Sequence, residues 1–316
     1  MSEKLSKNPV LRYFNQFERI IARIVPDSPW GNYVISQYRY FLDNFSFANV
    51  KNPRGFPEYL MRFKLSEAAR DPIFEQISDK ELVKNFVADR AGPGKTIETL
   101  AVLTSADEID RFQFPANCVA KPTHLSGAVV FVRDRQPSAD EKTQMKRWLT
   151  TNFFHLNREP NYKNLKPKII VEPFVGENNQ SPDDVKIFCF HGQPKLIQID
   201  YGRHGTHLRD IYDIEGQRLD ITFRHKPALR EFPYKEEIDD MLALARELSQ
   251  GFYFLRVDLY VVGGHLFVGE LTNYPTNCVV HFQPRDMDET IGRMTEDPTI
   301  GFNPPLAKAP TKAGAG

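Results

Sequence analysis

The chain has 316 residues, of which 41% are apolar and 26% are charged, a composition typical of a globular protein with one to three domains. Its 41 lysines and arginines balance 41 aspartates and glutamates, so no overall charge favours a nucleic acid or an anionic membrane as partner. The N-terminus lacks the apolar core of a signal peptide, and no apolar run approaches the ~20 residues of a membrane span. We therefore expect a cytoplasmic protein with no integral membrane segment and no nucleic-acid partner.

The three cysteines indicate a reducing compartment. Cys118, Cys189 and Cys278 are far apart in the sequence, each within an apolar run, and none belongs to a pattern with zinc-ligand spacing. We expect buried free thiols.

The first third of the chain predicts helices separated by irregular segments. Asn8-Pro9 reads as a helix cap with proline at the first helical position, and apolar residues at helical spacing follow it. Residues 50–75 are rich in proline and glycine, which predicts irregular structure. Another helix is expected after Ser78-Asp79. The segment GPGKT (92–96) lacks the first glycine and the preceding strand of a P-loop, so it predicts a turn.

From Asn117 onward the pattern predicts mainly strands. Strands are expected at 117–122, 128–132 and 168–175, followed by a hairpin of 185–190 with 195–199. Helices are expected at 141–155 and 236–249. Residues 201–235 predict loops, and the tail 297–316 predicts disorder because it is rich in Pro, Ala, Gly and Lys.

Residues 256–275, RVDLYVVGGHLFVGELTNYP, are the most informative segment of the chain. They read as two strands joined by glycines, with Asp258 in the first strand and Glu270 in the second. A buried carboxylate needs a compensating charge. Two oxygen ligands on adjacent strands suit Mg²⁺, and a buried salt bridge of Arg256 with either acid is an equally good explanation.

The register of this hairpin decides whether the two acids meet. A two-residue Gly263-Gly264 loop would put Asp258 and Glu270 on opposite faces, whereas a three-residue loop sets them directly across from each other. We predict the three-residue loop, which pairs Val262 with Leu266, because it separates a polar face from an apolar one. In this register Asp258 pairs with Glu270, and Arg256 pairs with Thr272. The predicted apolar face of the hairpin consists of Leu255, Val257, Leu259, Val261, Phe267 and Leu271.

Three shorter patterns are each weak alone. Lys121 ends a strand and precedes a loop with Ser126 and Gly127, a pattern that can hold phosphates and that is also found in ordinary surface hairpins. Glu172-Pro173-Phe174-Val175 places an acid at the end of a strand beside apolar residues. Asp184 and Lys186 share one face of a strand, where they suit a ribose and a phosphate or a solvated ion pair.

The order of these patterns resembles the ATP-grasp superfamily, and more narrowly the TupA-like ATP-grasp family, named for teichuronopeptide biosynthesis. The resemblance covers roughly residues 45–285. The segments that carry it are VKNPRGFPEYLMRFKL, ISDKELVKNFV, CVAKPTHLSGA, IIVEPF, DDVKIFCFHGQPKLI, LRDIYD, LALARELS and RVDLYVVGGHLFVGELTNYP.

This resemblance implies an α+β chain in which ATP lies between two sheets. The implied parts are an N-terminal helical extension (1–45), an N-terminal α/β subdomain (46–115), a small closing subdomain (116–175), a C-terminal subdomain with an antiparallel sheet and the metal site (176–296), and the tail.

The resemblance also implies roles for individual residues, with ATP and Mg²⁺ as cofactors. The nucleotide would be bound by Lys80 or Lys84, Lys121, Ser126, Gly127, Glu172, the backbone of Phe174 and Val175, Asp184 and Lys186. The metal would be bound by Asp258 and Glu270, with Thr272 at the position of a third ligand. Arg256 and Lys121 would act in catalysis, and Arg203, His207, Arg209 and Asn273 would contact the acceptor.

Two positions depart from the family pattern. Thr272 stands where many ATP-grasp enzymes have asparagine, which leaves the third metal ligand open. Thr276-Asn277-Cys278-Val279-Val280 replaces a glycine-rich stretch, which predicts an altered acceptor pocket because glycine lets the backbone approach a ligand closely.

The implied activity is an ATP-dependent ligase that makes an amide through an acyl phosphate. Its acceptor would be a small molecule or a glycan, such as a carboxylate of a surface-polysaccharide precursor. A kinase that phosphorylates a sugar hydroxyl and a nucleotide-binding protein without turnover are the alternatives.

Overall fold

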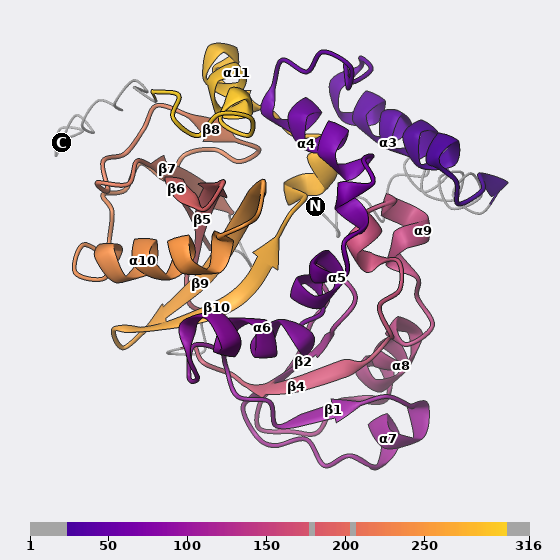
Figure 1. Cartoon of the computed structure of the whole chain (residues 1–316). Helices are drawn as coiled ribbons and strands as arrows, with labels where there is room; N and C mark the ends of the chain where they lie inside the picture. The colour runs from indigo at the N-terminus through magenta and orange to yellow at the C-terminus, as the bar shows by residue number, and fades with distance from the viewer. Residues whose placement is uncertain (1–23, 177–180, 203–206, 302–316) are drawn as a thin grey trace, which may run out of the picture.

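Two antiparallel sheets organise the computed structural model, which describes residues 24–176, 181–202 and 207–301 (Figure 1). The smaller sheet has the strand order β1-β4-β2-β3, the larger has the order β10-β9-β5-β6-β7, and β11 pairs with β8. The strands are β1 (Ala101–Leu103), β2 (Cys118–Pro122), β3 (Val130–Val132), β4 (Ile169–Pro173), β5 (Asp184–Phe190), β6 (Gln193–Tyr201), β7 (Leu208–Tyr212), β8 (Thr222–Phe223), β9 (Phe254–Val262), β10 (His265–Thr272) and β11 (Phe282–Gln283). The predicted α+β class with a C-terminal antiparallel sheet is confirmed.

Helices cover both faces of the larger sheet. Helices α6 and α10 pack on one face, and α4, α11 and η3 form a second apolar cluster with the other. Helices α7 and α8 pack on the smaller sheet (Figure 1). The helical segments are α3 (Pro29–Asn44), α4 (Phe56–Lys64), η1 (Ala68–Arg70), α5 (Pro72–Ser78), α6 (Leu82–Ala91), α7 (Ala106–Arg111), α8 (Ala139–Trp148), α9 (Phe153–Asn157), η2 (Pro160–Tyr162), α10 (Ile238–Ser249), η3 (Pro275–Cys278) and α11 (Arg285–Arg293). Among the described residues, no helix combines the length and apolarity needed to cross a bilayer.

Strand β9 shows how the sequence divides the larger sheet into an apolar and a polar face. Leu255, Val257 and Leu259 belong to the cluster that α10 covers. Because side chains alternate along a strand, Arg256 and Asp258 point to the opposite face. That face therefore carries charged groups in the middle of a buried strand.

The β9–β10 hairpin aligns its two acids by a route that differs from the predicted one. Val262 pairs with His265, so Gly263-Gly264 forms a two-residue turn, and the predicted three-residue loop is wrong. Both glycines have positive φ, as a type I′ turn requires. Asp258 nevertheless pairs with Glu270, because the register shifts between Val268 and Glu270.

A β-bulge at Gly269 produces that shift. With the two-residue turn alone, Asp258 would pair with Gly269. The extra residue in β10 moves the pairing by one position, so that Asp258 pairs with Glu270. A Cβ at Gly269 would lie 2.7 Å from the Tyr260 ring, so the bulge needs a glycine. Phe267 pairs with Tyr260, which places it outside the predicted apolar face, whereas Leu266 and Val268 lie in the core there.

Several expected elements differ from the structure. Residues 50–75 contain α4, η1 and α5 where irregular structure was expected, because the prolines at 57 and 72 begin helices instead of interrupting them. The expected helix 141–155 is two helices, α8 and α9, and the expected loop 201–235 contains β7 and β8. The expected helix after Asn8-Pro9 and the expected disordered tail lie outside the described residues, apart from the first few tail positions.

The other expectations hold. The helix after Ser78-Asp79 is α6, and the Asp79 carboxylate accepts hydrogen bonds from the backbone N–H groups of Glu81 and Leu82. GPGKT is a turn, as predicted, and its Lys95 carbonyl accepts from the Val268 N–H at 2.7 Å, beside the bulge. All three cysteines are buried free thiols.

Candidate functional site

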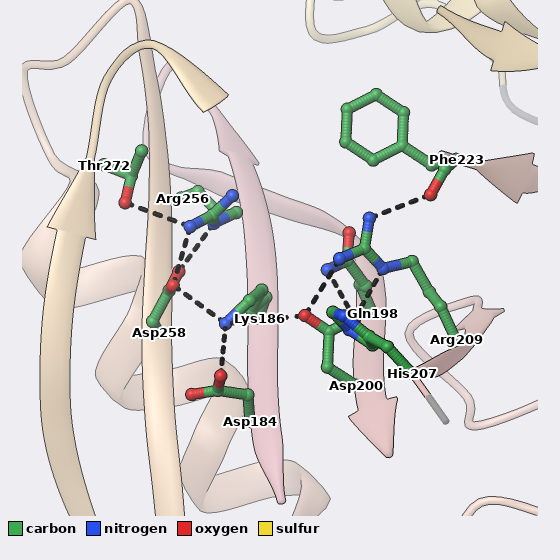
Figure 2. A network of polar contacts seen from close by, with 10 residues as sticks. All are labelled: Asp184, Lys186, Gln198, Asp200, His207, Arg209, Phe223, Arg256, Asp258 and Thr272. Carbon is green, nitrogen blue, oxygen red and sulfur yellow. Dashed lines mark hydrogen bonds and ion pairs between the residues drawn. The ribbon is translucent and has the colours of Figure 1, made fainter. Parts of the chain in front are cut away.

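The polar face of the larger sheet holds a network of buried charges centred on Asp258 (Figure 2). Arg256 Nε lies 2.7 Å from Asp258 Oδ1, and its Nη2 lies 2.7 Å from Asp258 Oδ2. Lys186 Nζ lies 3.1 Å from Asp258 Oδ2 and 3.2 Å from Asp184 Oδ2. The buried salt bridge that the sequence left open is therefore present, and Asp258 has cationic partners within the protein.

The strand register explains how these residues meet. Lys186 of β5 pairs with Asp258 of β9, and Arg256 pairs with Thr272 of β10. Directly opposite residues share a face, so the four side chains converge. Arg256 Nη2 also donates to Thr272 Oγ1 at 3.1 Å, so the threonine hydroxyl holds the guanidinium.

Electrostatics keep this network ionised. Burial disfavours the charged form of Asp258, but Arg256 and Lys186 outweigh it and hold the pKa of Asp258 below its usual value. Burial likewise opposes the charge of Arg256, while Asp258, Glu270 and Asp200 together raise the pKa of the guanidinium. The Asp258 carboxylate and the Arg256 guanidinium therefore stabilise each other's charged form.

Glu270 differs from Asp258 although the two are paired across the strands. It is half-buried, and its carboxylate has no hydrogen-bond or ion-pair partner among the described residues. Asp258 and Glu270 together offer a pair of hard oxygen ligands, a donor set that fits Mg²⁺. Across the described ranges, no group of three or more His, Cys, Asp or Glu side chains is arranged to hold a metal, so other ligands would have to come from phosphate and water.

A second charged cluster lies on the smaller sheet and α6. Glu172 of β4 is buried, its Oε1 lies 2.6 Å from Lys84 Nζ, and its other oxygen forms an ion pair with Lys121 of β2. Burial disfavours the Glu172 carboxylate, and the two lysines reverse that effect and lower its pKa. Lys80 donates to the Leu125 carbonyl at 2.6 Å, in the loop after Lys121.

The Glu172 cluster faces a small cavity of about 10 Å³ between the sheets, and the residues of the Asp258 network are not among those that line it. The bulge at Gly269, next to Glu270, forms one side of the cavity, and the smaller sheet with α6 forms the other. The lining residues are Lys80, Val83, Lys84, Ile97, Lys121, Glu172, Val268 and Gly269. The structure thus places both Lys80 and Lys84 at this cavity, and the choice that the sequence left between them stays open.

The loop between β2 and β3 presents Ser126 and Gly127 to solvent, near the lysines. Gly127 has φ +73°, and a Cβ at this position would meet open space, so the backbone conformation and not crowding explains the glycine. His124 of the same loop is buried, and its Nε2 is 3.0 Å from the Trp148 carbonyl. This contact with α8 anchors the loop.

The segment after β4 is partly engaged within the protein. The Phe174 N–H donates to the Asn117 carbonyl at 2.8 Å. The Phe174 ring contacts the edge of Phe131, and the Arg133 guanidinium lies over it. Val175 is half-buried. Because the Phe174 N–H already has an acceptor within the protein, it is not free to donate to a nucleotide base as the resemblance implied.

The expected acceptor residues are divided among different environments. Arg203 lies outside the described residues. Arg209 is on β7 and not in a loop, and its Nε and Nη2 lie 2.5 and 2.9 Å from the two oxygens of Asp200. His207 Nε2 lies 3.4 Å from Asp200 Oδ1. Asn273 is buried, and its Oδ1 has no partner among the described residues.

Sequence reasoning missed two buried acids at this site. Asp200 ends the apolar strand β6 and joins Arg209 to the network, with Oδ2 3.9 Å from Lys186 Nζ. A lone acid in an apolar strand was the signal that identified Asp258, and it was present here too. Glu159, beside η2, is buried as well, and burial with the nearby charge of Glu270 raises its pKa to about 7 against the opposing effect of Lys64. No pattern in the sequence points to Glu159.

Two sheets that enclose lysines on one side and paired carboxylates on the other are the arrangement of an ATP-grasp fold. The chain belongs to the TupA-like ATP-grasp family, whose sequence model matches residues 59–295. This confirms the resemblance found in the sequence. A search of the curated proteins finds no match.

Solved structures similar to this chain include three that are named as ligases. The ligase PsnB, complexed with a phosphomimetic precursor variant, Mg and ADP, is 13% identical over 76% of this chain and 65% of its own, with a TM-score of 0.40. D-alanine–D-alanine ligase from Bacillus anthracis complexed with ATP is 22% identical over 63% and 55%, with a TM-score of 0.36. Phosphoribosylamine–glycine ligase from Thermotoga maritima is 11% identical over 74% and 58%, with a TM-score of 0.42. The chain thus spans between 55% and 65% of the length of these three proteins.

Proposed function

We propose that this protein is an ATP-dependent ligase that joins a carboxylate to an amine through an acyl phosphate. The observation that carries the proposal is the convergence of three lysines and the Gly269 bulge on one small cavity between the sheets. Lys80, Lys84 and Lys121 converge on it from one side, and the bulge that sets Glu270 against Asp258 forms the other. Membership of the TupA-like ATP-grasp family supports a nucleotide as the ligand.

The residues of the smaller sheet suit a nucleotide triphosphate. The three lysines supply positive charge, and the exposed Ser126-Gly127 loop supplies a hydroxyl and backbone N–H groups. Glu172 holds two of the lysines in place through its ion pairs. We also propose that residues 116–175 act as the closing subdomain, together with β1, which pairs with β4.

The residues of the larger sheet suit the transferring phosphoryl group. Asp258 and Glu270 would hold Mg²⁺, which when bound neutralises charge on phosphate oxygens. Arg256 is fixed by Asp258 and Thr272, so its guanidinium is preorganised for negative charge that develops at the reacting centre. Lys186 is held between Asp184 and Asp258 and adds a second cation on the same face.

The substrates are a further part of the proposal. The name of the family supports a carboxylate of a surface-polysaccharide precursor as one substrate and an amino acid or amine as the other. Thr276, Asn277 and Cys278 all have positive φ, the conformation that a glycine-rich segment adopts easily. This segment therefore keeps a backbone geometry suited to glycine but with larger side chains, which supports an acceptor pocket that differs from that of glycine-rich relatives.

The test is a product analysis of the purified chain with ATP and Mg²⁺, across a panel of uronic acids and amino acids. A ligase releases ADP and phosphate and forms an amide only when both acceptors are present. A stable phosphorylated product with one acceptor would identify a kinase instead. Glu270→Gln is the control for contaminating ATPase, and no turnover with any pair would contradict the proposal.

A further inference from the structure

A second cavity, of about 440 Å³, lies beyond the charged network on the side of β8 and β11. Its walls are the C-terminal end of α3, residues 222–227, and residues 279–285. Neither the ATP-grasp resemblance nor the cavity between the sheets accounts for it. Its volume lies in the range of ordinary ligand sites.

The lining of this cavity is strongly cationic. Arg224, Lys226 and Arg285 contribute positive charges, and Asp43 is the exposed acid at its edge. Among the described residues, the side chains of Arg224 and Lys226 make no hydrogen bond or ion pair, and Arg285 reaches Asp288 only at 3.9 Å. Three weakly engaged cations around one concave surface favour a ligand with more than one negative charge.

The walls are held in place by a buried chain of hydrogen bonds. The Tyr40 hydroxyl of α3 lies 2.6 Å from His281 Nε2, and His281 Nδ1 lies 2.6 Å from Asp288 Oδ2 of α11. The Phe282 N–H donates to Asp288 Oδ1 at 2.8 Å. This chain joins the α3 wall to residues 279–285, and the pairing of β8 with β11 joins residues 222–227 to the same wall. The cationic side chains therefore project from a connected frame, which lowers the entropic cost of binding.

The cavity is connected to the candidate site through Arg209. This arginine donates to the Phe223 carbonyl of β8 at 2.8 Å and pairs with Asp200, which faces Lys186 (Figure 2). His225 lines the cavity, and its ring stacks on His207 at 3.8 Å between centroids. One polar network therefore runs from the cavity to Lys186, and from there to Asp258.

We propose that this cavity binds the diphosphate group of an acceptor substrate and thereby positions the reacting carboxylate near Arg256. Guanidinium groups bind phosphate oxygens in pairs of hydrogen bonds, and the lysine adds a point charge. A diphosphate of this kind could belong to a soluble nucleoside diphosphate sugar or to a lipid-linked sugar. The inference rests on the proposed function and names the chemical class of its acceptor.

The primary test is pyrophosphate binding to the full chain, measured by calorimetry with ADP and Mg²⁺ present at saturation. Arg224→Gln and Lys226→Gln should each weaken pyrophosphate affinity about tenfold or more, since each removes a charged hydrogen bond. Both side chains are exposed, so both variants should melt like wild type. Lys235→Gln is the matched control, because Lys235 is exposed beside α10 on the other face of the larger sheet, and it should leave pyrophosphate affinity unchanged.

Competition then separates the two sources of the diphosphate. Displacement of pyrophosphate by UDP supports a nucleotide-linked acceptor, and displacement by phosphatidylcholine vesicles that carry a prenyl diphosphate supports a lipid-linked one. Wild-type affinity for pyrophosphate in both cavity variants would overturn the inference, and so would binding of pyrophosphate that neither competitor displaces.

The two proposals can fail separately. If the cavity variants lose pyrophosphate but no acceptor pair releases ADP, the ligase proposal fails and the anion site remains. If amide formation occurs and the cavity variants keep wild-type KM for every acceptor, the ligase proposal remains and the anion site fails.

Discussion

Asp258 and Glu270 pair across the same two strands, yet their removal should have different effects on stability. In Asp258→Asn, Arg256 and Lys186 keep their charges in a buried site after losing the carboxylate that both contact. In Glu270→Gln, no hydrogen bond or ion pair within the described residues is lost. We expect both variants to lose ATP turnover and only the first to lose substantial stability.

The structure sets the size of this difference. Breaking a buried ion pair by removing one partner costs about 3–5 kcal/mol. Lys186 keeps Asp184 at 3.2 Å, so we expect Asp258→Asn to fall near the lower limit of that range, at about 3 kcal/mol. With an m value of about 3 kcal/mol/M, the urea midpoint would fall by about 1 M. Glu270→Gln should stay within about 0.5 kcal/mol of wild type.

Urea unfolding followed by fluorescence, at neutral and at acidic pH, is the assay. Because the pKa of Asp258 is held below its usual value of 3.8, its contribution is complete above that pH and is lost as the pH falls further. The difference between wild type and Asp258→Asn should therefore shrink in acid. Arg256→Gln should cost less in the Asp258→Asn background than alone. Equal destabilisation by Asp258→Asn and Glu270→Gln would refute this reasoning.

Three further predictions follow from buried groups and close contacts. Glu172→Gln leaves two lysines without their shared carboxylate, so thermal melting should show a loss of about 3 kcal/mol and titration should show weaker ATP binding; unchanged stability would contradict the role of this pair. Gly269→Ala should cost about 1–3 kcal/mol because its Cβ meets the Tyr260 ring at 2.7 Å, and Tyr260→Ala should restore most of that loss, whereas additive losses would argue against a steric cause. Burial raises the pKa of Glu159 from 4.5 to about 7, so wild-type stability should fall as the pH rises toward that value. Glu159→Gln should therefore gain up to about 3 kcal/mol relative to wild type between pH 4 and pH 8. A stability difference between the two proteins that stays constant over this pH range would contradict the prediction.

The β9–β10 hairpin shows how far local sequence reasoning reaches. The chemical requirement that Asp258 and Glu270 face one another predicted their pairing correctly. The predicted three-residue loop was wrong. Two consecutive glycines with positive φ form a two-residue turn, and a bulge at Gly269 supplies the extra residue that the register needs. A bulge depends on the neighbour that would clash with a side chain, here Tyr260, and periodicity along one strand cannot show that contact.

The paired charges show a second limit. The position of Asp258 in an apolar strand indicated that its negative charge needs a positive partner. The sequence fitted two such partners equally well, a Mg²⁺ ion and the Arg256 guanidinium. Lys186 became a partner because β5 lies beside β9, a pairing between segments about seventy residues apart. Asp200 carried the same local signal as Asp258 and was overlooked, whereas Glu159 has no such signal and is significant only because folding buries it near Glu270 and Lys64.

The amino-acid sequence by itself determined the family and the strands that carry Lys186, Asp258 and Glu270, because the pattern of apolar and polar residues along a strand is a local property. Only the tertiary structure decided which charges neutralise one another, since Arg256 and Lys186 reach Asp258 through strand register and a bulge. It alone also brought Arg224 and Lys226 together with Arg285 around one cavity, because these two segments, about sixty residues apart, meet where β8 pairs with β11.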